Sequence, residues 1–229
     1  MSYNMWGNKP KQETNKQSSI NWSNKPKPEE IPYYDPVNNI APKVVVGLDR
    51  DGVINVDAID LSKDYVYKVE DFKPIPGSLE AIAKIRRLGH KIAIITNQGG
   101  IGKGIYTEAD VEKVHDHMFN LLGEAGCSSI DGLYYSETSL RADGFAKPNI
   151  GMFKRCEEQL PFIKFSKGYF VGDKISDLKA AFKVGAKPVL VLTGHGQSTL
   201  KELNKFSNQK IKKKTIIFDD LAQFADSLG

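Results

Sequence analysis

Short apolar runs that alternate with amphipathic stretches are the feature that most constrains the fold of this chain. The apolar runs are residues 44–48, 91–95, 133–135, 168–171, 188–192 and 216–218. The stretches with helical spacing are residues 78–88, 149–159, 176–184 and two that begin near Thr107 and Asp219, with Ser78 and Thr107 as expected N-caps. Strands that alternate with helices predict a parallel sheet covered on both sides. We therefore predict an α/β fold, a doubly wound parallel sheet in three layers.

The first 42 residues differ in composition from the rest of the chain. They are rich in Asn, Lys, Ser, Gln and Pro and contain few aliphatic residues, which predicts a disordered tail. Within it, the segment WGNKPK at residues 6–11 recurs as WSNKPK at residues 22–27. Two tethered copies could bind a protein partner bivalently, and a low-complexity tail is the alternative. We expect one catalytic domain at residues 43–229.

The composition excludes several classes of protein. The net charge of +4 is mild, and the basic run at residues 210–214 fits a solvated loop, so nucleic acid is not an expected partner. Neither an apolar leader nor a run of about 18 apolar residues is present, so no membrane association is expected. Cys127 and Cys156 are not paired in a CxxC motif, which excludes a four-cysteine zinc site. We expect a cytoplasmic monomer.

Polar motifs follow four of the apolar runs or the loops just after them. They are Asp49-Arg50-Asp51-Gly52, Thr96-Asn97, Lys147-Pro148 and Gly172-Asp173, with Asp177 four residues beyond the last motif. In open parallel sheets, ligands bind beyond the carboxyl ends of the strands. The sequence therefore predicts that these motifs meet in one site.

Asp49 and Asp51 are two residues apart at the end of the first run. Strand periodicity predicts that both side chains lie on one side, with Arg50 turned away. Two neighbouring carboxylates repel unless a cation or a proton separates them, and Mg²⁺ suits such a pair. A plain Asp-Gly turn is the alternative. A calcium loop is excluded because residues 52–54 lack the required acidic or amide side chains.

The other motifs add groups that bind phosphate or metal. The Thr96 hydroxyl and the glycine-rich loop at residues 98–104 can hold phosphate oxygens, although a flexible turn is the alternative for the loop. Lys147 could neutralise a phosphorylated intermediate, and Asp173 could complete a metal site. Asp177 could cap the following helix or hold Lys174. For Asp173 and Asp177, helix capping alone is the alternative interpretation. Together the groups indicate phosphoryl transfer through an aspartate nucleophile.

With these motifs, the chain resembles the haloacid dehalogenase-like superfamily of phosphohydrolases. Within it, the chain is most similar to D-glycero-D-manno-heptose 1,7-bisphosphate phosphatases, neighbours of the histidinol-phosphate phosphatases. The resemblance covers residues 43–228 and rests on residues 48–55, 96–98 with the following glycine loop, 131–135, 147–148 and 171–177. It implies a Rossmann-like sheet with a minimal cap, and a Mg²⁺-dependent phosphomonoesterase acting on a small phosphorylated sugar, heptose 1,7-bisphosphate first.

The resemblance also implies a role for each matching residue. Asp49 would be the nucleophile and a metal ligand, and Asp51 the general acid/base, with its backbone carbonyl on the metal. Thr96 and Lys147 would stabilise the transferring phosphoryl group, and Asp173 would complete the metal site. The substrate pocket would be lined by Arg50, Asp57, Asn97, Gln98 and Lys174, and by Tyr65 across an apparent insertion at residues 58–64.

Three departures from the family pattern bear on the substrate. Residues 136–146 contain no Cys or His, so we expect no zinc in this loop and a shorter rim. Ala146 replaces the usual Arg before Lys147, a role that Arg141 could take over, and Val53 replaces the usual Thr. Three alternatives therefore stay open: histidinol phosphate as substrate, a nucleic-acid 3′-phosphate (the Thr96-Asn97-Gln98 region also resembles polynucleotide kinase 3′-phosphatases), and a non-catalytic adaptor that works through the tail.

Overall fold

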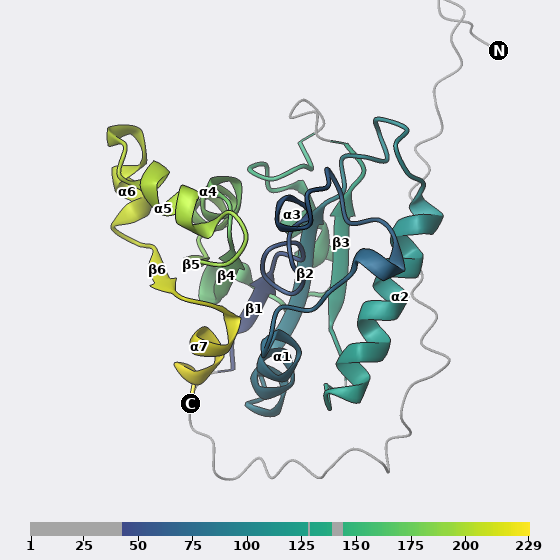
Figure 1. Ribbon diagram of the computed structural model, residues 1–229. Coiled ribbons are helices and arrows are strands. Elements are labelled where there is room, and N and C mark those ends of the chain that lie inside the picture. Colours follow the sequence, from purple (N-terminus) through teal and green to yellow (C-terminus); the bar gives the residue numbers. More distant parts are fainter. Residues whose placement is uncertain (1–42, 128, 139–143) are drawn as a thin grey trace, which may run out of the picture.

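A parallel six-stranded sheet forms the centre of the computed structural model, which describes residues 43–127, 129–138 and 144–229 (Figure 1). The strands are β1 (Val45–Leu48), β2 (Lys91–Asn97), β3 (Gly132–Ser136), β4 (Tyr169–Gly172), β5 (Lys187–Val191) and β6 (Ile216–Phe218). All six match predicted strands. The predicted tail and its repeat lie outside the described residues.

The strand order β3-β2-β1-β4-β5-β6 places β1 between β2 and β4. In register, Leu48 pairs with Ile94 on one side and with Val171 on the other. The chain moves outward from β1 to β3 and then returns to the other side of β1, so the strand order reverses between β1 and β4. In doubly wound sheets this switch point opens a crevice at the carboxyl ends of the strands.

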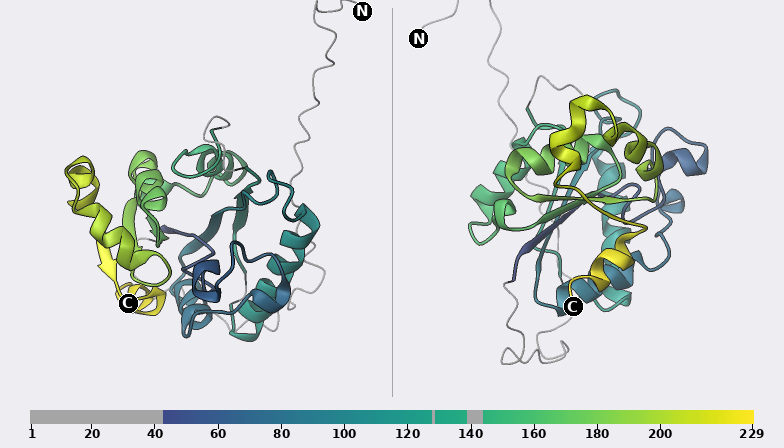
Figure 2. Two further views of the ribbon diagram at one scale, coloured as in Figure 1. Left: turned by 45° about the horizontal axis from the view of Figure 1, so that its top comes forward. Right: turned by 90° about the vertical axis from the view of Figure 1, so that its left-hand side faces the viewer.

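Helices cover both faces of the sheet (Figure 2). They are α1 (Ser78–Arg87), α2 (Glu108–Glu124), α3 (Gly151–Gln159), α4 (Ile175–Val184), α5 (Gly196–Leu203), α6 (Gln209–Lys212) and α7 (Leu221–Asp226). One hydrophobic core joins one face of the sheet to α1, α2 and α7, and a second joins the other face to α3 and α4. The predicted three-layer arrangement is confirmed.

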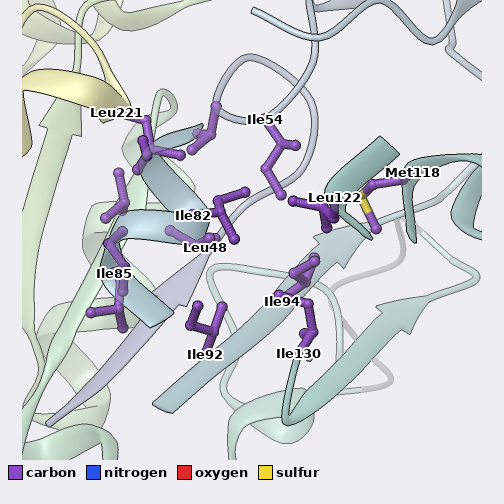
Figure 3. Close-up of a cluster of buried hydrophobic side chains, with 14 of the residues drawn as sticks. Leu48, Ile54, Ile82, Ile85, Ile92, Ile94, Met118, Leu122, Ile130 and Leu221 are labelled. Atoms are coloured by element: carbon purple, nitrogen blue, oxygen red, sulfur yellow. The ribbon is translucent and has the colours of Figure 1, made fainter. Parts of the chain in front are cut away.

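Alternating strand residues feed the two cores. Val46 and Leu48 of β1 belong to the first core, whereas Val45 belongs to the second, as the two-residue period of a strand requires. Figure 3 shows the first core, where side chains of the sheet and of α1 and α2 pack together. The β-branched residues of the apolar runs therefore fix which side of each strand faces which helix layer.

Two local expectations need correction. Ser78 is not the N-cap of α1, because Gly77 takes that place with a φ of 79° and the Ser78 hydroxyl donates to the carbonyl of Ile54 at 2.6 Å. The sequence also gave us no prediction of α5 and α6. By contrast, Thr107 caps α2 as predicted, in a capping box with Asp110.

The segment between β1 and α1 includes Asp57, whose carboxylate pairs with Lys174 just after β4. It contains two short 3₁₀ helices, Ala58–Leu61 and Val69–Asp71. Asp57 caps the first of them by accepting a hydrogen bond from the Ile59 backbone N–H. The apparent insertion at residues 58–64 is therefore the turn that follows Asp57.

Candidate active site

The four polar motifs meet at the carboxyl ends of β1, β2 and β4, as predicted. Asp49 follows β1 and its backbone N–H donates to Val171 of β4 at 2.9 Å. Thr96 is the last residue but one of β2, and Asp173 follows β4 directly. Lys147 reaches the same place from the loop before α3, with its side chain almost completely buried.

Three carboxylates form a compact cluster with one ammonium group. Oxygens of Asp49, Asp173 and Asp177 lie within 4.8 Å of one another, and all three residues are buried. The Lys147 ammonium lies 2.8 Å from Asp49 Oδ1 and 2.8 Å from Asp177 Oδ1. The cluster thus holds three acids and one base in a place that water hardly reaches.

The protonation of this cluster follows from its burial. Burial raises the pKa of Asp49 to about 6, although the charge of Lys147 opposes the change. Burial also raises the pKa of Asp173 well above its ordinary value. Burial works to lower the pKa of Lys147, but Asp177 and Asp49 outweigh it and hold this pKa above its usual range. The acids exceed the available positive charge, so a cation would be bound favourably.

The donor set fits Mg²⁺. Asp173 Oδ1 is buried and accepts no hydrogen bond from any residue that the structure describes, while Oδ2 accepts from the His195 backbone N–H at 2.8 Å. Two glycines leave room for this carboxylate, since a Cβ at Gly52 would lie 2.2 Å and one at Gly194 2.5 Å from Asp173 Oδ2. Buried carboxylate oxygens without a partner are suitable ligands for a hard divalent cation.

Asp177 caps α4, as predicted, and it also contacts Lys147, which the sequence did not indicate. Its Oδ2 accepts from the Lys174 backbone N–H at 2.9 Å, in a capping box at the start of α4. Its Oδ1 faces Lys147. The Lys174 ammonium itself turns away and pairs with Asp57 instead. Asp177 was not among the predicted metal ligands, because the capping pattern explained it fully.

Asp51 lies beside the carboxylate cluster and has its own set of partners. Arg50 donates to both of its oxygens, through Nε at 3.1 Å and Nη2 at 3.0 Å. Asn55 and Gln98 donate to the same carboxylate at 3.0 and 3.2 Å. The expectation that Arg50 turns away from Asp51 was wrong, because β1 ends at Leu48 and the strand alternation does not continue.

Arg50 was also expected to line the substrate pocket, but the structure places it beneath the site. Its side chain has no exposed surface, and its guanidinium donates to Asp51, Gln98 and the carbonyl of Val66. Its partners in the site are Gln98, which is itself buried, and Asp51, whose side chain is 19% exposed. The geometry therefore makes Arg50 a support for Asp51.

Gln98 connects Asp51 with Thr96. Its amide nitrogen donates to Asp51 Oδ2 and to Thr96 Oγ1, the latter at 3.1 Å. Its amide oxygen accepts from the Tyr106 hydroxyl at 3.1 Å. Burial raises the pKa of Tyr106 to about 12, so its hydroxyl keeps the proton that it donates. The sequence did not indicate Tyr106, which lies just after the glycine-rich loop.

Asn97 holds the backbone of Lys147. Its side-chain oxygen accepts from the Lys147 N–H at 2.9 Å, and its amide nitrogen donates to the Lys147 carbonyl at 3.2 Å. These two bonds tie the loop before α3 to the end of β2. Asn97, which was expected to line the substrate pocket, therefore positions the residue that carries the buried ammonium.

A polar rim lies on the β4 side of the crevice. Lys174 and His195 approach opposite oxygens of Asp57, at 2.8 and 3.4 Å. Burial of Asp57 opposes its ionisation, but the Lys174 charge prevails and holds the pKa of Asp57 below its ordinary value. Sequence reasoning missed His195 and the neighbouring Thr193, whose hydroxyl donates to the Gly52 carbonyl at 2.6 Å. The pattern Thr-Gly-His-Gly after β5 was the available signal.

Aromatic side chains cluster beside the glycine-rich loop that follows β2. The ring of Tyr106 stacks on Tyr67 with centroids 5.0 Å apart and meets Tyr65 edge-on at 5.5 Å. Lys103 of the glycine-rich loop donates to the Tyr65 hydroxyl at 2.8 Å. Tyr65 therefore lies beside Tyr106 and the glycine-rich loop. Arg141, the proposed substitute for the arginine missing at Ala146, lies outside the described residues.

Comparison with known proteins agrees with this geometry. Residues 144–224 match the family model described as HAD-hydrolase-like. The chain is 39% identical over 181 residues to D-glycero-beta-D-manno-heptose-1,7-bisphosphate 7-phosphatase of Pseudomonas putida, covering 79% of this chain and 97% of that protein. A relative of the same name from Neisseria meningitidis is 35% identical over 78% of this chain and 90% of that protein.

The chain belongs to this family of heptose bisphosphate phosphatases, within the haloacid dehalogenase-like hydrolases.

Solved structures of heptose bisphosphate phosphatases share the fold. The enzyme of B. bronchiseptica, solved with magnesium and phosphate, has a TM-score of 0.71 and 29% identity, and the match covers 81% of this chain and 97% of that chain. The enzyme of Burkholderia thailandensis has a TM-score of 0.60 and 32% identity over 81% of this chain and 98% of that chain. The match extends along almost the whole length of each of these phosphatases.

Proposed function

We propose that this protein is a Mg²⁺-dependent phosphatase that removes the 7-phosphate of D-glycero-D-manno-heptose 1,7-bisphosphate. The proposal rests on family membership together with one observation, the buried cluster of Asp49, Asp173 and Asp177 around Lys147. The printed names of the relatives supply the substrate and the position of the phosphate. The relative solved with magnesium and phosphate supports the choice of metal.

In the proposed reaction, Asp49 attacks the phosphorus and the bond from phosphorus to the substrate oxygen breaks. The leaving oxygen takes its proton from Asp51, which must be protonated for this step. Asp51 then accepts a proton from water, and the resulting hydroxide attacks the phosphoaspartate. Inorganic phosphate leaves and the Asp49 carboxylate is restored.

The remaining residues neutralise and orient the phosphoryl group. Lys147 and the Thr96 hydroxyl would bind its oxygens. When Mg²⁺ is bound by Asp49, Asp173 and the Asp51 carbonyl, it supplies further positive charge where negative charge develops. We propose that Asp57, Asn97, Gln98 and Lys174 face the rest of the sugar, and that Arg50 acts indirectly through Asp51.

Four further expectations remain part of the proposal. We propose that the enzyme works without zinc and in the cytoplasm, where the free, buried Cys127 and Cys156 would stay reduced. Among the described residues, no helix combines the length and apolar character needed to cross a bilayer. We propose a monomer, with a protein partner for the repeated segment of the tail.

Phosphate release from a substrate panel tests the proposal. The panel contains both anomers of heptose 1,7-bisphosphate, histidinol phosphate and a 3′-phosphorylated oligonucleotide, each with and without Mg²⁺. We expect one heptose anomer to be strongly preferred and Asp49→Asn to fold but not turn over. A preference for histidinol phosphate or for the oligonucleotide would show that the heptose assignment is wrong. An active Asp49→Asn variant would refute the mechanism.

A further inference from the structure

The buried guanidinium of Arg50 is the starting point. It has no exposed surface, yet it carries a full positive charge, so each of its N–H groups needs an acceptor. Nε and Nη2 face Asp51, and Nη2 also donates to the Val66 carbonyl at 2.8 Å. These contacts account for one edge of the planar group. The remaining nitrogen, Nη1, requires an acceptor of its own.

That partner is His115 of α2, which lies 65 residues away in the chain. Its Nε2 is 3.2 Å from Arg50 Nη1, and the residue is only 4% exposed. A guanidinium can only donate, so the imidazole Nε2 must offer a lone pair and the ring must be neutral. Burial, helped by the charge of Arg50, lowers the pKa of His115 well below its ordinary value, which agrees with a neutral ring.

We propose that His115 is a positioning residue that fixes the plane of Arg50 and thereby aims the Asp51 carboxylate at the leaving group. This inference rests on the proposed function, in which Asp51 is the general acid/base. His115 is buried, and its contact with Asp51 runs through Arg50.

The geometry explains why one acceptor matters. The guanidinium is a rigid fork, so anchoring Nη1 on His115 and Nη2 on Val66 determines where Nε and Nη2 meet Asp51. Without His115, a buried donor would lose its partner, and the fork would turn toward another acceptor. Asp51 would turn with it, since both of its oxygens accept from Arg50.

Leaving-group chemistry separates this role from simple packing. A sugar alkoxide must be protonated as it leaves, whereas p-nitrophenolate leaves without help from an acid. A misaligned Asp51 therefore slows the transfer from a sugar phosphate more than the transfer from p-nitrophenyl phosphate. The value of kcat/KM isolates this step, because it ends at the first irreversible step, which in the proposed reaction is departure of the leaving group. Loss of packing alone would lower both rates together.

The test compares two substitutions at His115 in the full-length protein with Mg²⁺. His115→Leu keeps much of the volume but offers no acceptor, whereas His115→Gln offers an amide oxygen near the place of Nε2. We expect His115→Leu to lower kcat/KM for the sugar phosphate about tenfold or more. The loss should appear in kcat rather than in KM. The value of kcat/KM for p-nitrophenyl phosphate should change far less. His115→Gln should recover most of the loss.

Two reference variants fix the interpretation. His117 lies two residues further along the same helix and packs against Phe72. The variant His117→Leu should behave like the parent protein. Asp51→Asn should show the largest loss that is selective for the sugar phosphate. Suppose that Asp51→Asn lowers kcat/KM selectively for the sugar phosphate, but that His115→Leu lowers kcat/KM for both substrates equally or for neither. The positioning role is then refuted and the proposed function stands.

Other outcomes are equally decisive. If Asp51→Asn shows no selective loss, the proposed role of Asp51 fails and the inference fails with it. A glutamine variant as impaired as the leucine variant would also refute the role, because it would show that the acceptor is not what counts. Should His115→Leu not fold, His115→Asn takes its place, since its shorter amide cannot reach Nη1, and we expect the same selective loss.

Discussion

The Lys147 ammonium lies 2.8 Å from Asp49 Oδ1, and both side chains are almost completely buried. It lies equally near Asp177, so one positive charge serves two acids. Removing one partner of a buried ion pair leaves uncompensated charge, which is strongly unfavourable. We therefore expect Lys147 to matter both for the integrity of the site and for the proposed transfer of the phosphoryl group.

Substitution of Lys147 by Met should reveal both functions. We expect kcat/KM to fall by about 10²-fold or more and the free energy of unfolding to fall by about 3 kcal/mol in the absence of metal. Steady-state kinetics and urea unfolding measure the two effects separately. Lys183→Met is the matched control, because this lysine is exposed and donates to the Pro148 carbonyl, and the substitution should change neither quantity appreciably. Near-parental activity of Lys147→Met would contradict this account.

Magnesium should stabilise the folded protein through Asp173. At a concentration about 100 times its Kd, Mg²⁺ should raise the melting temperature by roughly 5–10 °C. Asp173→Asn should lose most of this shift, yet melt no lower than the parent without metal, because it removes a carboxylate whose ionisation burial disfavours. Thermal unfolding with and without Mg²⁺ measures this, and Asp226→Asn at an exposed position is the control. An unchanged Mg²⁺ shift in Asp173→Asn would exclude Asp173 as a ligand.

His115 should make the stability of the protein depend on pH. Burial and the Arg50 charge keep the folded-state pKa of His115 well below 6.5, whereas the unfolded chain titrates near that value. Below about pH 6.5 the unfolded state therefore binds the extra proton, and the free energy of unfolding falls as the pH falls, by at most about 1.4 kcal/mol per unit.

Urea unfolding of the parent and of His115→Gln between pH 5.5 and 7.5 isolates this contribution. The two proteins should differ least at the acidic end, because only the parent loses stability through this residue. Identical pH dependence in both would show that His115 titrates normally in the folded state.

Tyr106 should support catalysis through Gln98. Tyr106→Phe removes the hydroxyl that donates to Gln98 Oε1, which should cost about 1 kcal/mol of stability and lower kcat by less than tenfold. Tyr67→Phe is the matched control, because Tyr67 contacts Tyr106 through ring stacking, which the substitution preserves. Urea unfolding and steady-state kinetics measure the two effects. Equal effects of both substitutions would argue against a role for the hydrogen bond from Tyr106 to Gln98.

Much of the fold and part of the site could be predicted from the sequence. Apolar runs in a parallel sheet are continuous and distinctive, so every strand was found, and the motifs after β1, β2 and β4 met as expected. The acid cluster formed by Asp49 and Asp173 follows from the same rule about the carboxyl ends of strands.

The remaining features depend on contacts between distant segments. Arg50 could not be placed because the alternation of side chains ends with the strand, and His115, its partner, lies in a helix 65 residues away. The Thr-Gly-His-Gly pattern marks the loop that contains His195, but His195 holds Asp173 through its backbone N–H, a contact that the residue type does not reveal. Asp177 satisfied a local capping pattern, and that pattern concealed its contact with Lys147.

The most direct test of the central claim is a ³¹P NMR time course of D-glycero-D-manno-heptose 1,7-bisphosphate with the protein and Mg²⁺. Our account predicts that the signal of the 7-phosphate disappears as inorganic phosphate grows, while the 1-phosphate persists. Asp49→Asn should leave both signals unchanged. Loss of the 1-phosphate first, or no hydrolysis of either anomer, would contradict the proposed function.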